Sequence, residues 1–339
     1  MHNHTTLQHD WFAVDPTWSA LGYATLESYL QTWVPQPTFH ALVPEDVHKA
    51  YRTTCYLFAN AWHHYPMYDQ GLQHLLGTME MSVKIRAEQL AITLSSTAKQ
   101  GKSGFPTLNN LIEQVCQYHQ ARNLKQKLHW ARKIRNYHAH PERYSYAPVM
   151  MQQAVVPLLN LLNELFIEPS LATQTEQYLT TLNQQLHGVQ NTLLILEHQG
   201  LRYLVHQAQP LRAFFTNGQW RTIWVFHPVL PKAQEALTQH RYLRPLVLCL
   251  SAVEIKDGGL VAQEVGSGQL VRVLVNEDPR NQPVWDAHQQ AWQQANRTDQ
   301  WLFSSSQQSD MLTAQNKLEH QFGWGYTSTD VTEPSLTNA

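Results

Sequence analysis

Residues 72–90 read LQHLLGTMEMSVKIRAEQL, and this stretch decides the fold of the first half of the chain. Its apolar residues recur three or four positions apart, which is the spacing of one face of an α-helix. The stripe comprises Leu72, Leu75, Leu76, Met79, Val83, Ala87 and Leu90. We therefore expect a long helix from about Tyr68, buried along one side. Similar spacing predicts helices over 44–61, over 107–138 with a possible restart near Ala121, and over 148–166 with a kink at Pro157.

Residues 1–40 form an aromatic-rich N-terminal extension that we expect to pack on another part of the protein. A helix over 18–32 is predicted there, and Pro35 and Pro37 break the chain after it. The helical bundle itself is expected over 41–168.

The next segment, 169–200, is predicted to be one connecting helix with a heptad pattern. Thr173 and Glu176 fit a capping box, and Gly200 stands where a helix C-cap glycine belongs. The heptad positions are Leu179, Leu182, Leu186, Val189, Leu193 and Leu196. Such a seam packs either on the protein's own core or on a second helix, as a dimer seam or a rigid strut.

After Gly200 the pattern changes from helical to extended. Runs rich in Val, Leu, Ile and aromatic residues predict strands over 220–226, 245–255, 260–264 and 269–275, separated by glycine-containing turns. Further helices are expected over 232–239, 283–296 and 310–322. The fold class is thus α+β, with a mainly antiparallel sheet over 201–325 and a disordered tail over 326–339.

Composition limits the classes of function. The 339 residues carry a formal net charge of −2, and only 15% are charged, so nucleic-acid binding through bulk charge is excluded. The three cysteines give no disulfide framework, which favours a reducing compartment. We expect a cytoplasmic protein without a signal peptide or a membrane partner, because no long apolar run is present.

The stretch 133–142, KIRNYHAHPE, carries the candidate chemistry. Cleavage of RNA requires a base for the 2′-hydroxyl and an acid for the 5′-oxygen, and imidazole suits both roles near neutral pH. A fixed guanidinium donates two parallel hydrogen bonds to phosphate oxygens. Arg135 and His140 are therefore the candidate catalytic residues. Two copies of the chain would bring two such pairs to one phosphate.

The choice between two histidines remains open. His138 lies near the Arg135 face of a continuous helix, whereas His140 is roughly 140° away at about 100° per residue. Pro141 interrupts the helix there, which allows His140 to turn back. We favour His140 and keep His138 as the competitor.

This stretch resembles the catalytic members of the HEPN superfamily (higher eukaryotes and prokaryotes nucleotide-binding domains). Arg135, Asn136 and His140 match the family pattern of an arginine, a polar residue and a histidine, and Pro141–Glu142 resembles the usual continuation. The resemblance covers roughly residues 42–166 and implies a four- or five-helix bundle.

It also implies a metal-independent endoribonuclease that acts on RNA as a homodimer or higher oligomer, with a composite active site and 2′,3′-cyclic phosphate products. Such proteins serve as toxins, phage-defence effectors or RNA-processing enzymes, and the first two roles imply an antitoxin or other defence-system partner. The alternative is a non-catalytic HEPN module that binds nucleotides or holds a complex together.

Other residues are supporting candidates. Asn136 and His138 are expected to assist the pair, and Lys133, Arg132 and Arg86 are candidates for RNA backbone binding. Glu80 and Lys84 are interpreted as a structural i,i+4 ion pair. Although the chain has 19 histidines, His138 with His140 and the His63–His64 pair lack the spaced partners of a zinc site, so no metal and no cofactor are expected.

Overall fold

The computed structural model describes residues 10–92, 107–119, 123–138, 148–186, 192–256 and 258–325. The chain divides into two compact units, one made of 1–39 with 43–166 and the other of 40–42 with 167–339. The fold is α+β, as predicted. Within the described ranges, no single helix is long and apolar enough to cross a membrane, although α7 and α8 meet that criterion when taken together across a bend.

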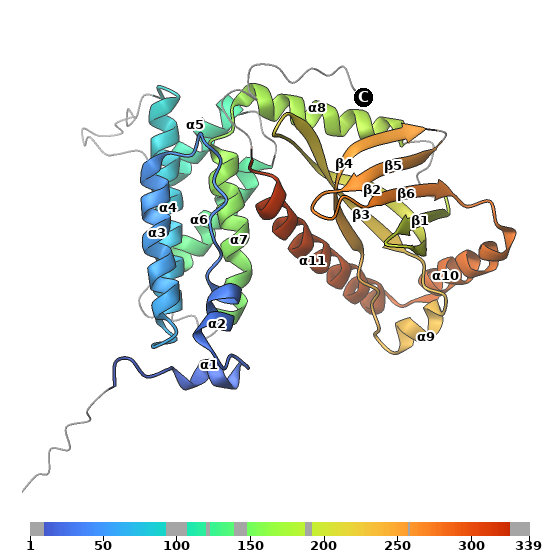
Figure 1. Ribbon diagram of the computed structural model, residues 1–339, viewed down its shortest axis with the longest axis horizontal. Helices are drawn as coiled ribbons and strands as arrows, with labels where there is room; N and C mark the ends of the chain where they lie inside the picture. Colours follow the sequence, from blue (N-terminus) through green and yellow to red (C-terminus); the bar gives the residue numbers. More distant parts are fainter. Residues whose placement is uncertain are drawn as a thin grey trace, which may run out of the picture. The chain divides into compact units, whose positions relative to one another are not determined.

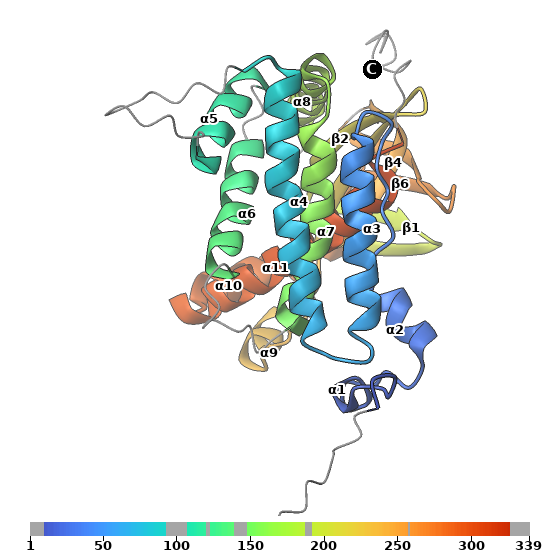
Figure 2. The same cartoon turned by 90° about the vertical axis from the view of Figure 1, so that its left-hand side faces the viewer.

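The first unit is helical, and its longest helix is α4 (Figure 1). Its helices are α1 (Pro16–Ala20), α2 (Leu26–Trp33), α3 (Glu45–Asn60), α4 (Met67–Gln89), α5 (Leu108–His119), α6 (Leu124–His138) and α7 (Pro148–Leu165). Figure 2 shows α3 on one side of α4 and α5 and α6 on the other. Because α4 is surrounded, its predicted apolar stripe from Leu72 to Ala87 is fully buried.

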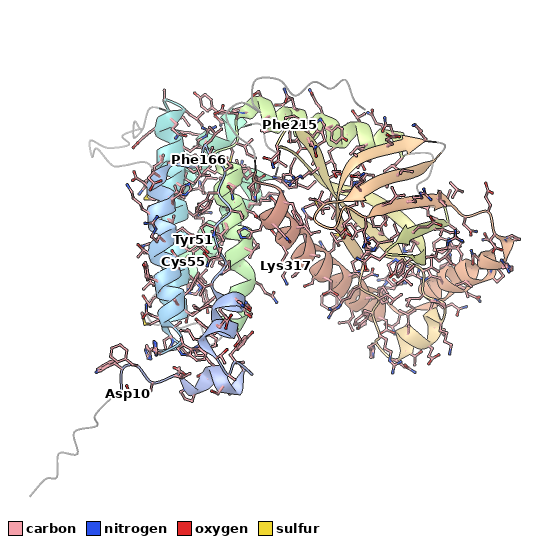
Figure 3. All side chains as sticks on the ribbon, in the orientation of Figure 1. Asp10, Tyr51, Cys55, Phe166, Phe215 and Lys317 are labelled. Carbon is pink, nitrogen blue, oxygen red and sulfur yellow. The ribbon has the colours of Figure 1, made fainter. Side chains whose placement is uncertain are left out.

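Trp18, Tyr29 and Trp33 of the N-terminal segment lie in this unit's core, whereas Trp11 and Phe12 are exposed. The predicted helix over 18–32 is wrong: it is broken into α1 and α2 by a turn in which Gly22 has a φ of +89°, a conformation that favours glycine. The Trp18 indole donates to the Ala61 carbonyl at 2.6 Å. Tyr51 of α3, labelled in Figure 3, donates a hydrogen bond from its hydroxyl to the Pro35 carbonyl.

The second unit is built on a closed antiparallel barrel. Among the described residues its strands are β1 (Leu194–His198), β2 (Leu201–Thr216), β3 (Gln219–Pro228), β4 (Leu246–Lys256), β5 (Gly259–Glu264) and β6 (Leu270–Val275). Each strand pairs with the next, and β6 returns to pair with β1. The four predicted strands are confirmed as β3–β6, but β1, β2 and the closure were not predicted.

The predicted heptad helix over 169–200 is wrong beyond its first half. Helix α8 (Pro169–Gln185) ends at Leu186, and Leu196 lies in strand β1. Gly200 is not a helix cap. Gln199 and Gly200 both have positive φ and form the tight turn between β1 and β2. Leu182, Leu186 and Leu196 share the barrel core, so a leucine seam common to one helix does not exist.

Besides α8, the described residues of the second unit form further helices outside the barrel. In chain order these are α9 (Ala233–Thr238), the short 3₁₀ helix η2 (Pro279–Asn281), α10 (Gln282–Gln294) and α11 (Arg297–Phe322). The predictions of α9 and α10 are confirmed, while α11 begins 13 residues before the predicted 310. It packs on β3 and β4, where a second apolar cluster forms around Phe214, Phe215 and Ile223. The tail at 326–339 is not among the described residues.

Candidate functional site

Arg135 lies in the last turn of α6 and is held by two partners. Its Nη2 is 2.8 Å from Glu80 Oε2 on α4, and its Nη1 donates to Asn136 Oδ1 at 3.3 Å. The side chain nevertheless remains 42% exposed. A guanidinium has five N–H donors, so two such bonds leave others for an oxyanion. Arg135 is thus fixed in direction and accessible.

Glu80 is the residue that connects the two helices. Its carboxylate also accepts from Lys84 Nζ at 2.9 Å, which confirms the predicted i,i+4 pair. The hydrogen bond from Lys84 and the charge of Arg135 hold the pKa of Glu80 below its usual range, against the opposing effect of burial. Glu80 is therefore ionised at neutral pH and keeps Arg135 in place.

His138 points into the protein rather than to the surface. It is 6% exposed, and its Nε2 has no hydrogen-bond partner among the described residues. Burial lowers the pKa of the imidazole, so the ring is neutral near pH 7. A buried neutral ring cannot reach a phosphate in this arrangement. His140 lies outside the described residues.

The three RNA-binding candidates differ in exposure. Lys133 is exposed on α6, and Arg132 is half-buried, with no hydrogen-bond partner for its Nε in the part of the chain that the structure describes. Arg86 is buried, with Nη1 donating to Gln89 Oε1 at 3.1 Å, so it does not present a cation to solvent. Arg132 and Lys133 are thus the accessible candidates.

Helix α6 is basic along its whole length. It carries Lys125, Lys127, Arg132, Lys133 and Arg135 and no Asp or Glu. Two aromatic rings, Trp130 and Tyr137, are 39% and 47% exposed and lie seven residues apart, two helical turns, with Lys133 between them. Exposed rings interleaved with cations are typical of surfaces that stack bases and track a phosphate backbone.

A second group of polar residues, which the sequence analysis missed, lines a cavity in the barrel unit. It contains His206, His227, Trp285 and His288. A signal was present: Trp285, His288, Gln289, Trp292 and Gln293 follow the i, i+3, i+4, i+7, i+8 pattern of one helix face. An apolar stripe at that spacing predicts a core face. This stripe of rings and amides instead indicates a polar cavity.

No group of three or more His, Cys, Asp or Glu side chains among the described residues is arranged to hold a metal ion. Comparison with protein-family models, with curated proteins and with solved structures found no match to this chain. Any assignment of function therefore depends on the chemistry of these residues.

Proposed function

We propose that the protein is a metal-independent endoribonuclease of the HEPN type, with Arg135 and His140 in the active site. The observation that carries the proposal is Arg135 itself, oriented by Glu80 and Asn136 yet accessible at the end of a basic helix. If the only role of Arg135 were a structural ion pair with Glu80, its side chain would not need to be exposed.

The proposed reaction is an intramolecular transesterification of RNA. A histidine removes the 2′-hydroxyl proton, the 2′-oxygen attacks phosphorus, and the bond to the 5′-oxygen breaks as a second histidine donates a proton to it. The products are a 2′,3′-cyclic phosphate and a 5′-hydroxyl, so atoms and protons balance. Arg135 stabilises the charge that develops on the phosphate oxygens.

The second histidine and guanidinium come from another copy of the chain. One His140 cannot serve as base and acid on opposite sides of the phosphate in a single step, whereas a symmetric pair supplies both. His138 is buried and neutral, and we assign it a positioning role at the end of α6. Lys133 on α6, with Trp130 and Tyr137 on the same side of the helix, would guide the single strand to the phosphate site.

Two single substitutions test the proposal. The wild-type protein is expected to cleave single-stranded RNA in the presence of EDTA, and Arg135→Ala and His140→Ala are expected to lose at least about a hundredfold in rate. Arg52→Ala and His64→Ala, at exposed positions elsewhere in the same unit, are the matched controls and should retain full activity.

Full activity in either catalytic variant would reject the assignment. If wild-type protein leaves RNA intact while binding a nucleotide, the chain is instead a non-catalytic HEPN module. A role as a toxin or defence effector would show as growth arrest on expression, abolished by Arg135→Ala, and the same expression gives material for capturing an antitoxin.

A further inference from the structure

The barrel unit contains a cavity of about 380 Å³ that the proposed nuclease reaction does not use. It lies where β2 and β3 meet α9, α10 and α11; Figure 1 shows α9 and α10 at the end of the barrel where β3 leads into α9. This volume falls within the range of small-molecule sites, roughly 300–1,000 Å³. The cavity is therefore large enough for a ligand of one or two rings.

The lining of the cavity carries no formal charge. The described residues that line it include no Asp, Glu, Lys or Arg. Burial, and for His206 also the neighbouring histidines, lower the pKa values of all three imidazoles, that of His206 to about 4, so the rings are neutral at pH 7. An ion that binds here would lose part of its hydration against the buried rings without gaining a counter-charge from the lining. The ligand that fits is uncharged.

Aromatic rings form one wall. His206 and Trp285 are stacked with centroids 5.4 Å apart and an interplanar angle of 22°, and Trp285 and His288 are stacked at 5.5 Å and 17°. Trp292 and Phe303 add further ring faces to the lining. Flat faces of this kind favour a flat ligand, because stacking buries both surfaces of a π-system.

The polar groups of the cavity are paired donors and acceptors. Gln207, Gln289, Gln293 and Gln307 contribute primary amides, each with an oxygen acceptor beside an N–H donor. Gln289 and Gln293 line the cavity with exposed side chains, and no hydrogen-bond partner is found for either among the described residues, so both amides are available. A glutamine amide matches the adjacent donor and acceptor on the edge of a base such as adenine.

One histidine has a defined tautomer. The backbone N–H of Leu230 donates to His288 Nδ1 at 3.2 Å. Since the neutral ring carries a single proton, that proton lies on Nε2, which becomes a further donor. The cavity therefore combines stacking faces, bidentate amides and an oriented imidazole donor.

We infer that this cavity of the barrel unit binds an uncharged nucleobase or nucleoside. The base stacks against the Trp285 wall, and its edge is read by the amides of Gln289 and Gln293. A sugar alone would use the amides but leave the flat walls without a matching face, and a phosphate group finds no cation in the lining. The inference stands independently of the nuclease proposal.

Titration of the full-length protein with adenosine, cytidine, AMP and methyl α-glucoside, followed by tryptophan fluorescence and calorimetry, tests this. At least one nucleoside is expected to bind saturably at one site, with AMP no tighter than the same nucleoside. Gln289→Leu and Gln293→Leu should each weaken that binding about tenfold or more, because a polar group of the ligand loses its partner.

Gln290→Leu and Gln294→Leu are the matched controls, since both residues lie on α10 outside the cavity. They should leave affinity within twofold, and circular dichroism should show the same fold in all four variants. The inference is overturned if neither nucleoside binds, if methyl α-glucoside alone binds, if AMP binds tenfold tighter than adenosine, or if the cavity and control variants behave alike. RNA cleavage by the Gln293→Leu variant should be unchanged, which separates this site from the nuclease.

Discussion

The two units of the chain arrange their polar side chains in opposite ways. At the end of α6, Arg135 is a permanent cation, partly exposed and paired with the carboxylate of Glu80. In the barrel cavity the polar groups are neutral imidazoles and amides, packed among tryptophans without a formal charge. The first arrangement is suited to a charged phosphate and the second to an uncharged ring.

This difference determines how each region responds to salt and to pH. Ion pairs at a surface are weakened by salt but tolerate changes of pH between the pKa values of their members. The stability contributed by neutral histidines does not depend on salt but does depend on pH, because protonation would place a charge in poorly solvated surroundings. The predictions below use these responses to separate the two regions.

The largest expected effect lies in the core of the barrel. Leu196 on β1 is fully buried in the barrel cluster, so Leu196→Asp places an unpaired carboxylate among apolar side chains. We expect a loss of about 4 kcal/mol or more in the free energy of unfolding, enough to unfold the unit. Chemical denaturation followed by circular dichroism and tryptophan fluorescence measures it.

Leu274→Asp is the matched control, because Leu274 lies on β6 with its side chain 41% exposed. It should change stability by less than about 1 kcal/mol. If Leu196→Asp instead left the fold intact and only shifted the oligomeric state in light scattering, the predicted heptad seam would be restored and the assignment of Leu196 to a strand would be wrong.

The sequence predicted the helical unit better than the barrel, for physical reasons that individual residues illustrate. The stripe from Leu72 to Ala87 is long and regular, so its helix was predicted within a few residues. Strand β2 has no such regularity: its pairing with β3 shifts register between Val205 and Gln207 and again between Pro210 and Arg212. A proline at an irregular position of a strand suppresses the period-2 signal.

The heptad error has a similar cause. The leucines at 179, 182 and 186 do lie on one helix, and those at 193 and 196 continue the spacing by coincidence across a change to extended backbone. Spacing alone does not reveal that the two halves reach the same core from different elements. In the same way, the partnership of Glu80 with Arg135 joins residues 55 positions apart and left no local signal.

The histidines of the cavity provide the second prediction, a dependence of stability on pH. Unfolding releases His206 from a site where its pKa is about 4 to water, where it is near 6.5. Between these values the unfolded chain binds more protons, so the free energy of unfolding rises as pH increases from about 4 to 6.5. The contribution of His206 is on the order of 3 kcal/mol, with His227 and His288 acting in the same direction.

Denaturation curves at several pH values check this by difference. His206→Gln should flatten the rise relative to wild type, whereas His64→Gln, at an exposed position of the helical unit, should leave it unchanged. The comparison with wild type is needed because burial raises the pKa of Asp69 to about 6. That carboxyl makes stability fall as pH rises, and it does so equally in wild type and in the His206→Gln variant. A wild-type curve and a His206→Gln curve that run parallel would contradict the low pKa of His206.

The smallest expected effect concerns the ion pairs around Arg135 and completes the contrast. Glu80→Gln removes the charge that Lys84 and Arg135 share, and since both cations are substantially exposed we expect a loss below about 1 kcal/mol. That loss should shrink further in high salt, where screening already weakens the pairs in wild type.

Glu88→Gln, an exposed position two turns further along α4, is the control and should show neither effect. Urea denaturation at low and high sodium chloride measures both. A salt-independent loss well above 1 kcal/mol would mean that Glu80 is held as a buried structural charge, and that Arg135 is part of the same internal network rather than an accessible cation.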